Sequence, residues 1–240
     1  MSGHSKWSTI KRQKGIADAK RGQAFTKLSN AITLAVRQGG GNADPESNFK
    51  LRLAIDRARG MNMPKDNIDR AIEKGKGVGA GNTLDEVVYE GFAPGGVAII
   101  VEAATDNKNR TTSEVKNLIE KNGGTMGSQG SVSYMFSRRG ELIVPKNGKS
   151  VDDIMMIALD GGLEDIEEID DMFVLYTSPE DLMKVKATLD AENIEIENAE
   201  LVYKAVTKVE TDETTFEKID MLMSKIDDHD DVQKVYSNVA

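Results

Sequence analysis

The residues with the clearest capacity for chemistry are the cations concentrated in the first forty positions. Only one acid, Asp18, lies among them. Lysines and arginines at this density bind phosphates, and each phosphate they neutralise adds salt-dependent affinity. Trp7 could stack on a base or hold a helix bundle together, and we expect it to pack. We predict a nucleic-acid contact at these positions: Lys6, Lys11, Arg12, Lys14, Lys20, Arg21 and Lys27. The alternative is a solvated basic helix face.

The charge of the chain is strongly segregated along its length. The 240 residues carry a net charge of -9, which by itself would argue against a polyanionic partner. Residues 1–76, however, hold 16 Lys/Arg and 7 Asp/Glu, a net charge of +9. Residues 77–240 hold 15 and 33, a net charge of -18. The basic part therefore has the sign that a nucleic acid requires.

Two loops offer further candidate contacts. Residues 106–111 present amides and cations where a helix N-terminus leaves backbone N–H groups unpaired, which predicts phosphate contacts at Asn107, Lys108, Asn109 and Arg110. The alternative is that these residues only cap and turn the chain. The glycine-rich loop 123–130 carries Met126 at its tip and could probe a ligand surface or serve as a plain connector. It follows a helix and precedes a strand, the reverse of nucleotide-binding loops, so we predict no nucleotide cofactor.

The residues available for catalysis are few. The chain has no cysteine and only two histidines, His4 and His229, so serine or cysteine triads have almost nothing to build on. No sequence motif of a hydrolase, P-loop or zinc protease is present. The acidic runs 164–171 and 227–231 are interpreted as solvated surface rather than cation sites. We predict no catalytic residue, metal, cofactor or small-molecule substrate, and thus no enzyme.

The same composition favours the cytoplasm. The absence of cysteine suits a reducing compartment, and the longest apolar run, residues 97–101, is too short to span a bilayer. The first residues lack the apolar core of a secretion signal. We expect a cytoplasmic protein without a membrane partner, and a monomer.

Hydrophobic periodicity predicts a small helical bundle in residues 1–76. Apolar residues recur at helical spacing over 8–37 and 47–59, and a third helix begins at Pro64 and closes at Gly75. Helices of this length are not stable alone, so they must share a core. Glycine at every second position over 75–81 predicts a flexible linker to the next domain.

The remaining elements predict two α/β domains. Strands at 87–92 and 96–105 form a hairpin, a helix opens with a capping box of Thr111 and Glu114, and a strand follows at 131–136. A βαββαβ order, the ferredoxin-like arrangement, then follows at 141–145, 150–160, 165–169, 172–177, 179–191 and 194–203. The helix 214–228 and strand 232–239 have no local partner, so we predict that they return to the first sheet. The fold class is α+β, with domains 1–76, 77–137 with 205–240, and 138–204.

Several separate motifs resemble the YebC/PmpR family over essentially the whole chain. They are the basic stretch up to residue 40, 3–7 (GHSKW), 62–68 (NMPKDNI), 89–91 (YEG), 105–111 (TDNKNRT) and 124–136 (GTMGSQGSVSYMF). The resemblance implies a helical N-terminal domain, two α/β domains and a DNA-binding transcriptional regulator. Similar proteins include the mitochondrial translational activator of cytochrome c oxidase subunit I, and bacterial members are linked to ribosomes stalled on proline runs.

Two functions therefore compete. The first is a transcription regulator whose bundle binds promoter DNA, with the acidic domains orienting it or meeting protein partners. The second is a ribosome-associated translation factor whose bundle and loops 106–111 and 123–130 contact ribosomal RNA or tRNA and relieve stalled elongation. The charge pattern alone does not separate the two polymers.

Overall fold

The computed structural model describes residues 18–77 and 84–240, with side chains described from Arg21 onward. The chain divides into two compact units. The first joins the chain up to Ser137 to Ala205–Ala240, and the second is Arg138–Lys204. The chain passes between them inside strands β4 (Phe136–Pro145) and β7 (Asn198–Ala205). The second unit has the limits that we predict for the ferredoxin-like domain, while a split of the first unit at residue 76 stays a prediction.

Three helices form the bundle of the first unit: α2 (Asp18–Gln38), α3 (Phe49–Gly60) and α4 (Lys65–Gly75). Apolar side chains at helical spacing, including Ile32, Leu51 and Ile68, make its core. Gly75 belongs to this core, not to a flexible linker, because a Cβ there would come within 2.6 Å of the Val36 Cβ. The rest of the predicted linker, from residue 78, lies outside the described residues.

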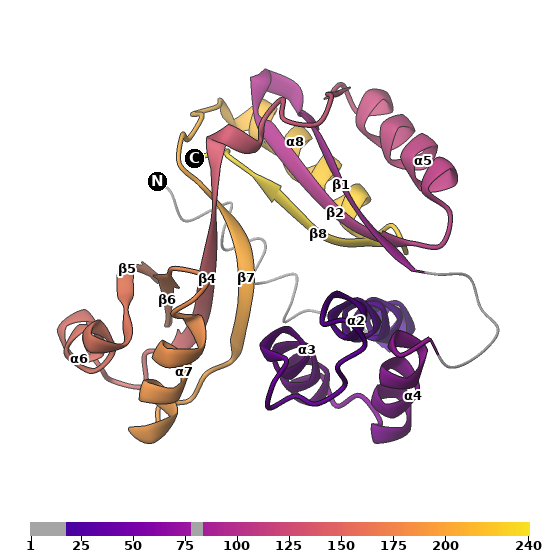
Figure 1. Ribbon diagram of the computed structural model, residues 1–240. Coiled ribbons are helices and arrows are strands. Elements are labelled where there is room, and N and C mark those ends of the chain that lie inside the picture. Colours follow the sequence, from indigo (N-terminus) through magenta and orange to yellow (C-terminus); the bar gives the residue numbers. More distant parts are fainter. Residues whose placement is uncertain (1–17, 78–83) are drawn as a thin grey trace. The chain divides into compact units, whose positions relative to one another are not determined.

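A four-stranded sheet with two helices on one face completes the first unit. Its strands run in the order β3 (Thr125–Met126), β1 (Asp85–Phe92), β2 (Ala98–Thr105), β8 (Val232–Ser237). Helices α5 (Lys108–Lys121) and α8 (Glu213–Asp227) bury Ile119 and Leu222 against it. Strand β8 pairs with β2, so the predicted return of the C-terminal helix and strand to this sheet is confirmed (Figure 1).

Two local predictions in this unit are wrong. Thr111 does not cap α5; the helix begins three residues earlier, and the Asn107 side chain accepts a hydrogen bond from the Arg110 N–H at 3.1 Å. No strand covers 131–136 either. A 3-10 turn spans Ser133–Met135, and β4 starts at Phe136 and runs on through the strand expected at 141–145. The strand fails because the backbone N–H groups of Val132 and Ser133 bond to a side chain instead of a neighbouring strand.

The second unit confirms the ferredoxin-like prediction. Between β4 and β7 come α6 (Val151–Ala158), a 3-10 turn (Leu159–Gly161), β5 (Leu163–Ile169), β6 (Met172–Thr177) and α7 (Leu182–Ala191). The sheet order is β5-β6-β4-β7. Apolar residues of both helices, including Ile154 and Val185, are fully buried. Among all the described helices, none has the length and apolar character to cross a membrane.

Candidate nucleic-acid interface

Most of the predicted basic contact lies outside the described residues. This holds for Lys6, Lys11, Arg12 and Lys14, and the side chain of Lys20 is likewise not described. Arg21 is exposed near the start of α2. Within the predicted set, Arg21 and Lys27 are thus the bundle residues whose side chains the structure describes.

Lys27 is held in a contact inside the first unit. Its side chain is 17% exposed, and its Nζ lies 3.4 Å from Asp227 Oδ1 and donates to the Asp227 carbonyl. Burial lowers the pKa of Lys27, although the Asp227 carboxylate opposes this. One helical turn earlier, Gln23 donates to the Asp228 carbonyl and to the Asp230 carboxylate. These carbonyls belong to the last turn of α8, where helical partners are missing, so Lys27 serves to hold α2 against α8.

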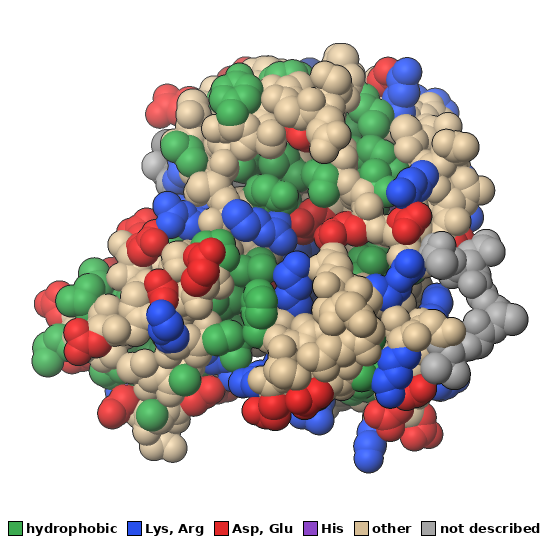
Figure 2. Space-filling view, in the orientation of Figure 1, with side chains coloured by type: hydrophobic (Ala, Val, Ile, Leu, Met, Phe, Trp, Pro, Cys, Tyr) green, Lys and Arg blue, Asp and Glu red, His purple; other side chains and the backbone are tan. Residues whose placement is uncertain are grey.

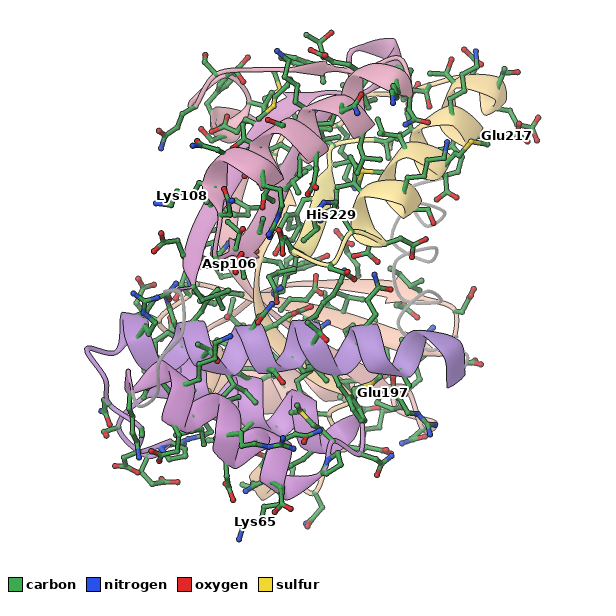
Figure 3. All side chains as sticks on the ribbon, turned by 90° about the vertical axis from the view of Figure 1, so that its right-hand side faces the viewer. Lys65, Asp106, Lys108, Glu197, Glu217 and His229 are labelled. Atoms are coloured by element: carbon green, nitrogen blue, oxygen red, sulfur yellow. The ribbon has the colours of Figure 1, made fainter. Side chains whose placement is uncertain are left out.

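Other bundle cations that sequence reasoning did not select are better placed for a phosphate. Arg59, Lys65 and Lys74 are exposed, and within the described parts of the chain none of their side chains has a hydrogen bond or ion pair. Lysine and arginine side chains lie over α4, interspersed with acids (Figure 2), and Lys65 projects away from the bundle (Figure 3). The lysines and arginines within residues 47–59 and 64–75 were the available signal in the sequence.

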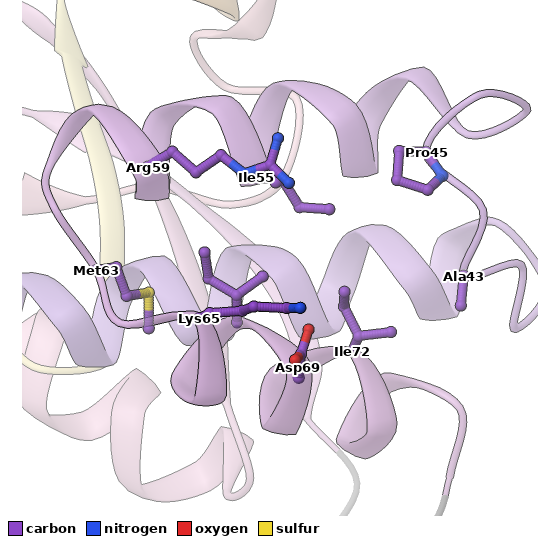
Figure 4. A pocket seen from close by; sticks show the side chains of 9 residues that line it. Ala43, Pro45, Ile55, Arg59, Met63, Lys65, Asp69 and Ile72 are labelled. Atoms are coloured by element: carbon purple, nitrogen blue, oxygen red, sulfur yellow. The ribbon is translucent and has the colours of Figure 1, made fainter.

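A pocket of about 310 Å³ opens between α3, α4 and the loop before α3. Its lining is mostly apolar, with Ile55, Met63 and Ile72 among the contributors (Figure 4). Arg59, Lys65 and Asp69 also line it. Because the lining is mostly apolar and includes a carboxylate, the pocket itself is a poor phosphate site, and the cations act as exposed groups.

The predicted contact at the start of α5 divides into structural and available side chains. Asn107 caps the helix, and Arg110 donates to Asp106 at 3.1 Å and to Asp231 at 2.8 Å. Asp231 also accepts from Thr111 Oγ1 at 2.6 Å. Burial would raise the pKa of Asp231, but these bonds, with Thr111 first, bring it below its ordinary value. This network fastens the start of α5 to the segment that leads into β8.

Lys108 and Asn109 remain available at this helix start. Lys108 is 58% exposed and projects outward (Figure 3), with its Nζ 3.4 Å from the Asp85 carboxylate. The Asn109 side chain is exposed and forms no hydrogen bond within the described residues. Both stand beside the partial positive charge of a helix N-terminus, which favours an anion. Of the four residues predicted to contact phosphate here, Lys108 and Asn109 are the two outside the Asn107 and Arg110 hydrogen bonds, and the contact itself stays a prediction.

The glycine-rich loop is ordered by a buried carboxylate that sequence reasoning missed. Glu90, 5% exposed in β1, accepts the backbone N–H groups of Gly130, Val132 and Ser133 at 2.8 to 2.9 Å. Burial would raise the pKa of Glu90, and these hydrogen bonds bring it below its ordinary value. The available signal was an acid inside an apolar strand, which must find donors.

Met126 does not lie at the loop tip as predicted. It belongs to β3, pairs with Gly91 and packs against the core of the sheet. The exposed residues of the loop include Ser128, Gln129 and Gly130 instead. Gly91 makes this pairing possible. A Cβ at position 91 would lie 2.7 Å from the Thr125 carbonyl oxygen, so glycine lets β3, with Met126, approach β1 closely.

One histidine and two carboxylates lie close together near the Arg110 network. Ligand atoms of Glu114, His229 and Asp231 are within 4.8 Å of one another. His229 Nδ1 accepts the Asp231 N–H at 3.1 Å, so Nε2 carries the proton toward Glu114, 3.0 Å away. The Arg110 guanidinium lies 2.8 Å from Asp231 and 3.9 Å from Glu114. It already supplies the positive charge that a metal would bring, so we keep the prediction of no metal.

Comparison with known proteins covers nearly the whole chain. Residues 5–78 match the TACO1/YebC protein N-terminal domain, and residues 84–239 match the TACO1/YebC second and third domain. A "Probable transcriptional regulatory protein" of Roseiflexus castenholzii is 49% identical over 100% of this chain and 95% of its own. A protein of Persephonella marina with the same description is 50% identical over 99% of this chain and 95% of its own.

A solved structure agrees with the fold. The crystal structure of a conserved hypothetical protein from Aquifex aeolicus has a TM-score of 0.86 and 43% sequence identity to this chain. The likeness covers 93% of this chain and 91% of that one. The α+β architecture is thus shared with an experimentally determined structure.

Proposed function

We propose that this chain, which belongs to the TACO1/YebC family, regulates transcription by binding DNA through its basic N-terminal bundle. The relatives compared above are described as probable transcriptional regulatory proteins. It acts as a binding protein, not an enzyme, and works in the cytoplasm as a monomer. Phosphate contacts supply most of the affinity, and the acidic remainder of the chain limits adhesion elsewhere.

The observation that carries this proposal is the charge segregation. Residues 1–76 carry a net charge of +9, whereas residues 77–240 carry a net charge of -18. A polyanion is attracted to the first part and repelled by the second, which orients the chain on it. Family membership supports the same function, because the relatives are described as probable transcriptional regulatory proteins.

The contact surface combines predicted and newly identified cations. Lys6, Lys11, Arg12, Lys14, Lys20 and Arg21 stay the predicted core of it. The exposed cations Arg59, Lys65 and Lys74 extend it over the bundle. Lys108 and Asn109 form a separate small contact at the start of α5, where Asn107 and Arg110 position the backbone.

The proposal is tested by charge reversal at Lys11, Arg12, Lys20 and Arg21. Binding of a labelled DNA duplex by the Glu variant is measured by fluorescence anisotropy across a salt series. We expect at least about a tenfold loss of affinity and a salt slope shallower by about 3.6, because four phosphate contacts disappear. The matched control reverses four exposed lysines of the acidic part, Lys121, Lys149, Lys184 and Lys218, and should leave DNA affinity unchanged.

Unchanged affinity and slope in the first variant would refute the basic segment as the contact. Crosslinking in cells, followed by sequencing of both DNA and RNA partners, tests the choice of polymer. Enrichment of promoter DNA is the expected result. Recovery of ribosomal RNA or tRNA without promoter DNA would overturn the transcription proposal in favour of a ribosome-associated translation factor.

A further inference from the structure

The outer face of α6 and the turn that continues it combine apolar side chains with free carboxylates. We propose that this face, defined by Asp152, Met156, Leu159 and Asp160, binds a segment of another protein that is basic and carries apolar side chains. The inference goes beyond DNA binding and does not depend on it. It gives the acidic unit Arg138–Lys204 a binding role of its own.

The first observation is exposure. Met156 is 82% exposed and Leu159 57% exposed, whereas Ile154 and Ala158 on the opposite side of the helix are fully buried. Among the large hydrophobic side chains of the described residues, Met156 is the most exposed. Isolated exposed apolar residues need no explanation, but two of them next to each other on one helix face form a patch that water solvates poorly.

The spacing places these groups on one line. Residues 152, 156 and 159 are four and three positions apart, so their side chains neighbour one another on a helix surface. Asp152 and Asp160 are exposed and stand at the two ends of this line. Figure 2 shows hydrophobic and acidic side chains side by side over α6, at the left of the view.

The second observation is that the acids on this face lack partners, unlike those on the adjoining strand. On β5, Asp165 pairs with Lys204 at 2.7 Å and Glu168 with Lys146 at 2.8 Å. Asp152 and Asp160 have no hydrogen bond or ion pair within the described parts of the chain. The face therefore retains negative charge that its own unit does not compensate.

Charge complementarity selects the partner. The unit Arg138–Lys204 holds 7 Lys/Arg and 17 Asp/Glu, a net charge of -10, so it repels nucleic acid and anionic membranes. A cationic protein segment would be attracted and could neutralise Asp152 and Asp160. Methionine adapts its shape to different apolar partners, which suits Met156 to such a contact.

The experiment uses the full chain labelled at its methionine methyl groups and followed by NMR. The probe is a short amphipathic helical peptide of leucine and lysine. We expect the Met156 methyl signal to shift and saturate. The double variant Met156→Ser, Leu159→Ser should weaken binding about tenfold, since it removes both apolar contacts. The double variant Asp152→Asn, Asp160→Asn should weaken binding several-fold and reduce its salt dependence.

The matched control is Met221→Ser, which removes a methionine of α8 that is 57% exposed, and it should leave peptide affinity unchanged. All three variants should bind DNA as the unaltered chain does. The proposal is overturned if the Met156 and Leu159 changes have no effect, or if a lysine-only peptide binds equally well. Concentration-dependent self-association that the same changes abolish would overturn it too, by identifying a second copy as the partner.

Discussion

Particular cations of the bundle and of the ferredoxin-like unit differ in whether a carboxylate lies beside them. In the unit Arg138–Lys204, Lys146, Lys186 and Lys204 each lie within 3 Å of a carboxylate oxygen of that unit. On the bundle, Arg59 and Lys65 are exposed without such a partner within the described residues. A surface attracts phosphates through the cations that carboxylates leave uncompensated, so counts of lysine and arginine alone are a poor guide.

The largest expected effect contrasts these two kinds of cation. Reversal of Arg59, Lys65 and Lys74 to Glu should weaken binding of a DNA duplex by roughly thirtyfold at low salt, since three uncompensated charges are lost. Reversal of the paired Lys146, Lys186 and Lys204 should change it less than about twofold. Anisotropy titrations measure both. Equal losses in the two variants would show that only net charge matters.

A substantial loss of stability is expected from Glu90→Gln. The amide offers one acceptor oxygen in place of two and turns an NH₂ group toward backbone donors, so it should cost about 2 kcal/mol in the free energy of unfolding. Urea denaturation at neutral pH measures the loss. Glu86→Gln, at an exposed position of the same strand, is the control and should cost less than about 0.5 kcal/mol.

The stability difference between the unaltered chain and Glu90→Gln should depend on pH. The folded-state pKa of Glu90 lies below its ordinary value of 4.5, so its stabilisation is present above pH 4.5. It is lost as the pH falls through the lowered folded-state value. The stability difference between the unaltered chain and Glu90→Gln should therefore shrink on acidification below pH 4.5. A difference that stays constant down to pH 3 would contradict the role of the carboxylate charge.

A smaller effect is expected for Lys27→Met. The variant keeps the apolar stem but removes the contact with Asp227, which should cost about 1 kcal/mol in thermal or urea unfolding. DNA affinity should change less than about twofold, because this ammonium group is already engaged. Arg59→Met is the matched control, with the opposite pattern of lost affinity and preserved stability. A large affinity loss for Lys27→Met would return it to the DNA contact.

The smallest effect is expected in the acidic unit. Glu168→Gln removes the ion pair with Lys146, and a pair with a half-exposed carboxylate contributes less than about 0.5 kcal/mol. Thermal unfolding should shift by no more than about 2 °C. A clearly larger shift would show that the pairs of β5 form a cooperative network rather than separate contacts.

Much of the architecture was predictable because it follows from local pattern. Apolar residues at helical spacing located the bundle, and the βαββαβ order of the second unit was readable from alternating strands and helices. Element limits differ by several residues where long-range contacts decide them. Thr111, for example, resembles a helix cap in sequence but is drawn into the helix and bonded to Asp231.

The charge segregation and the type of each element were already contained in the order of the residues, since both depend on neighbours within a few positions. The surroundings of each side chain were not. Lys27 meets Asp227 200 residues away, and Glu90 meets a loop 40 residues on. Because such partners are brought together only by packing, tertiary structure alone decided which cations face solvent and which hold the fold together.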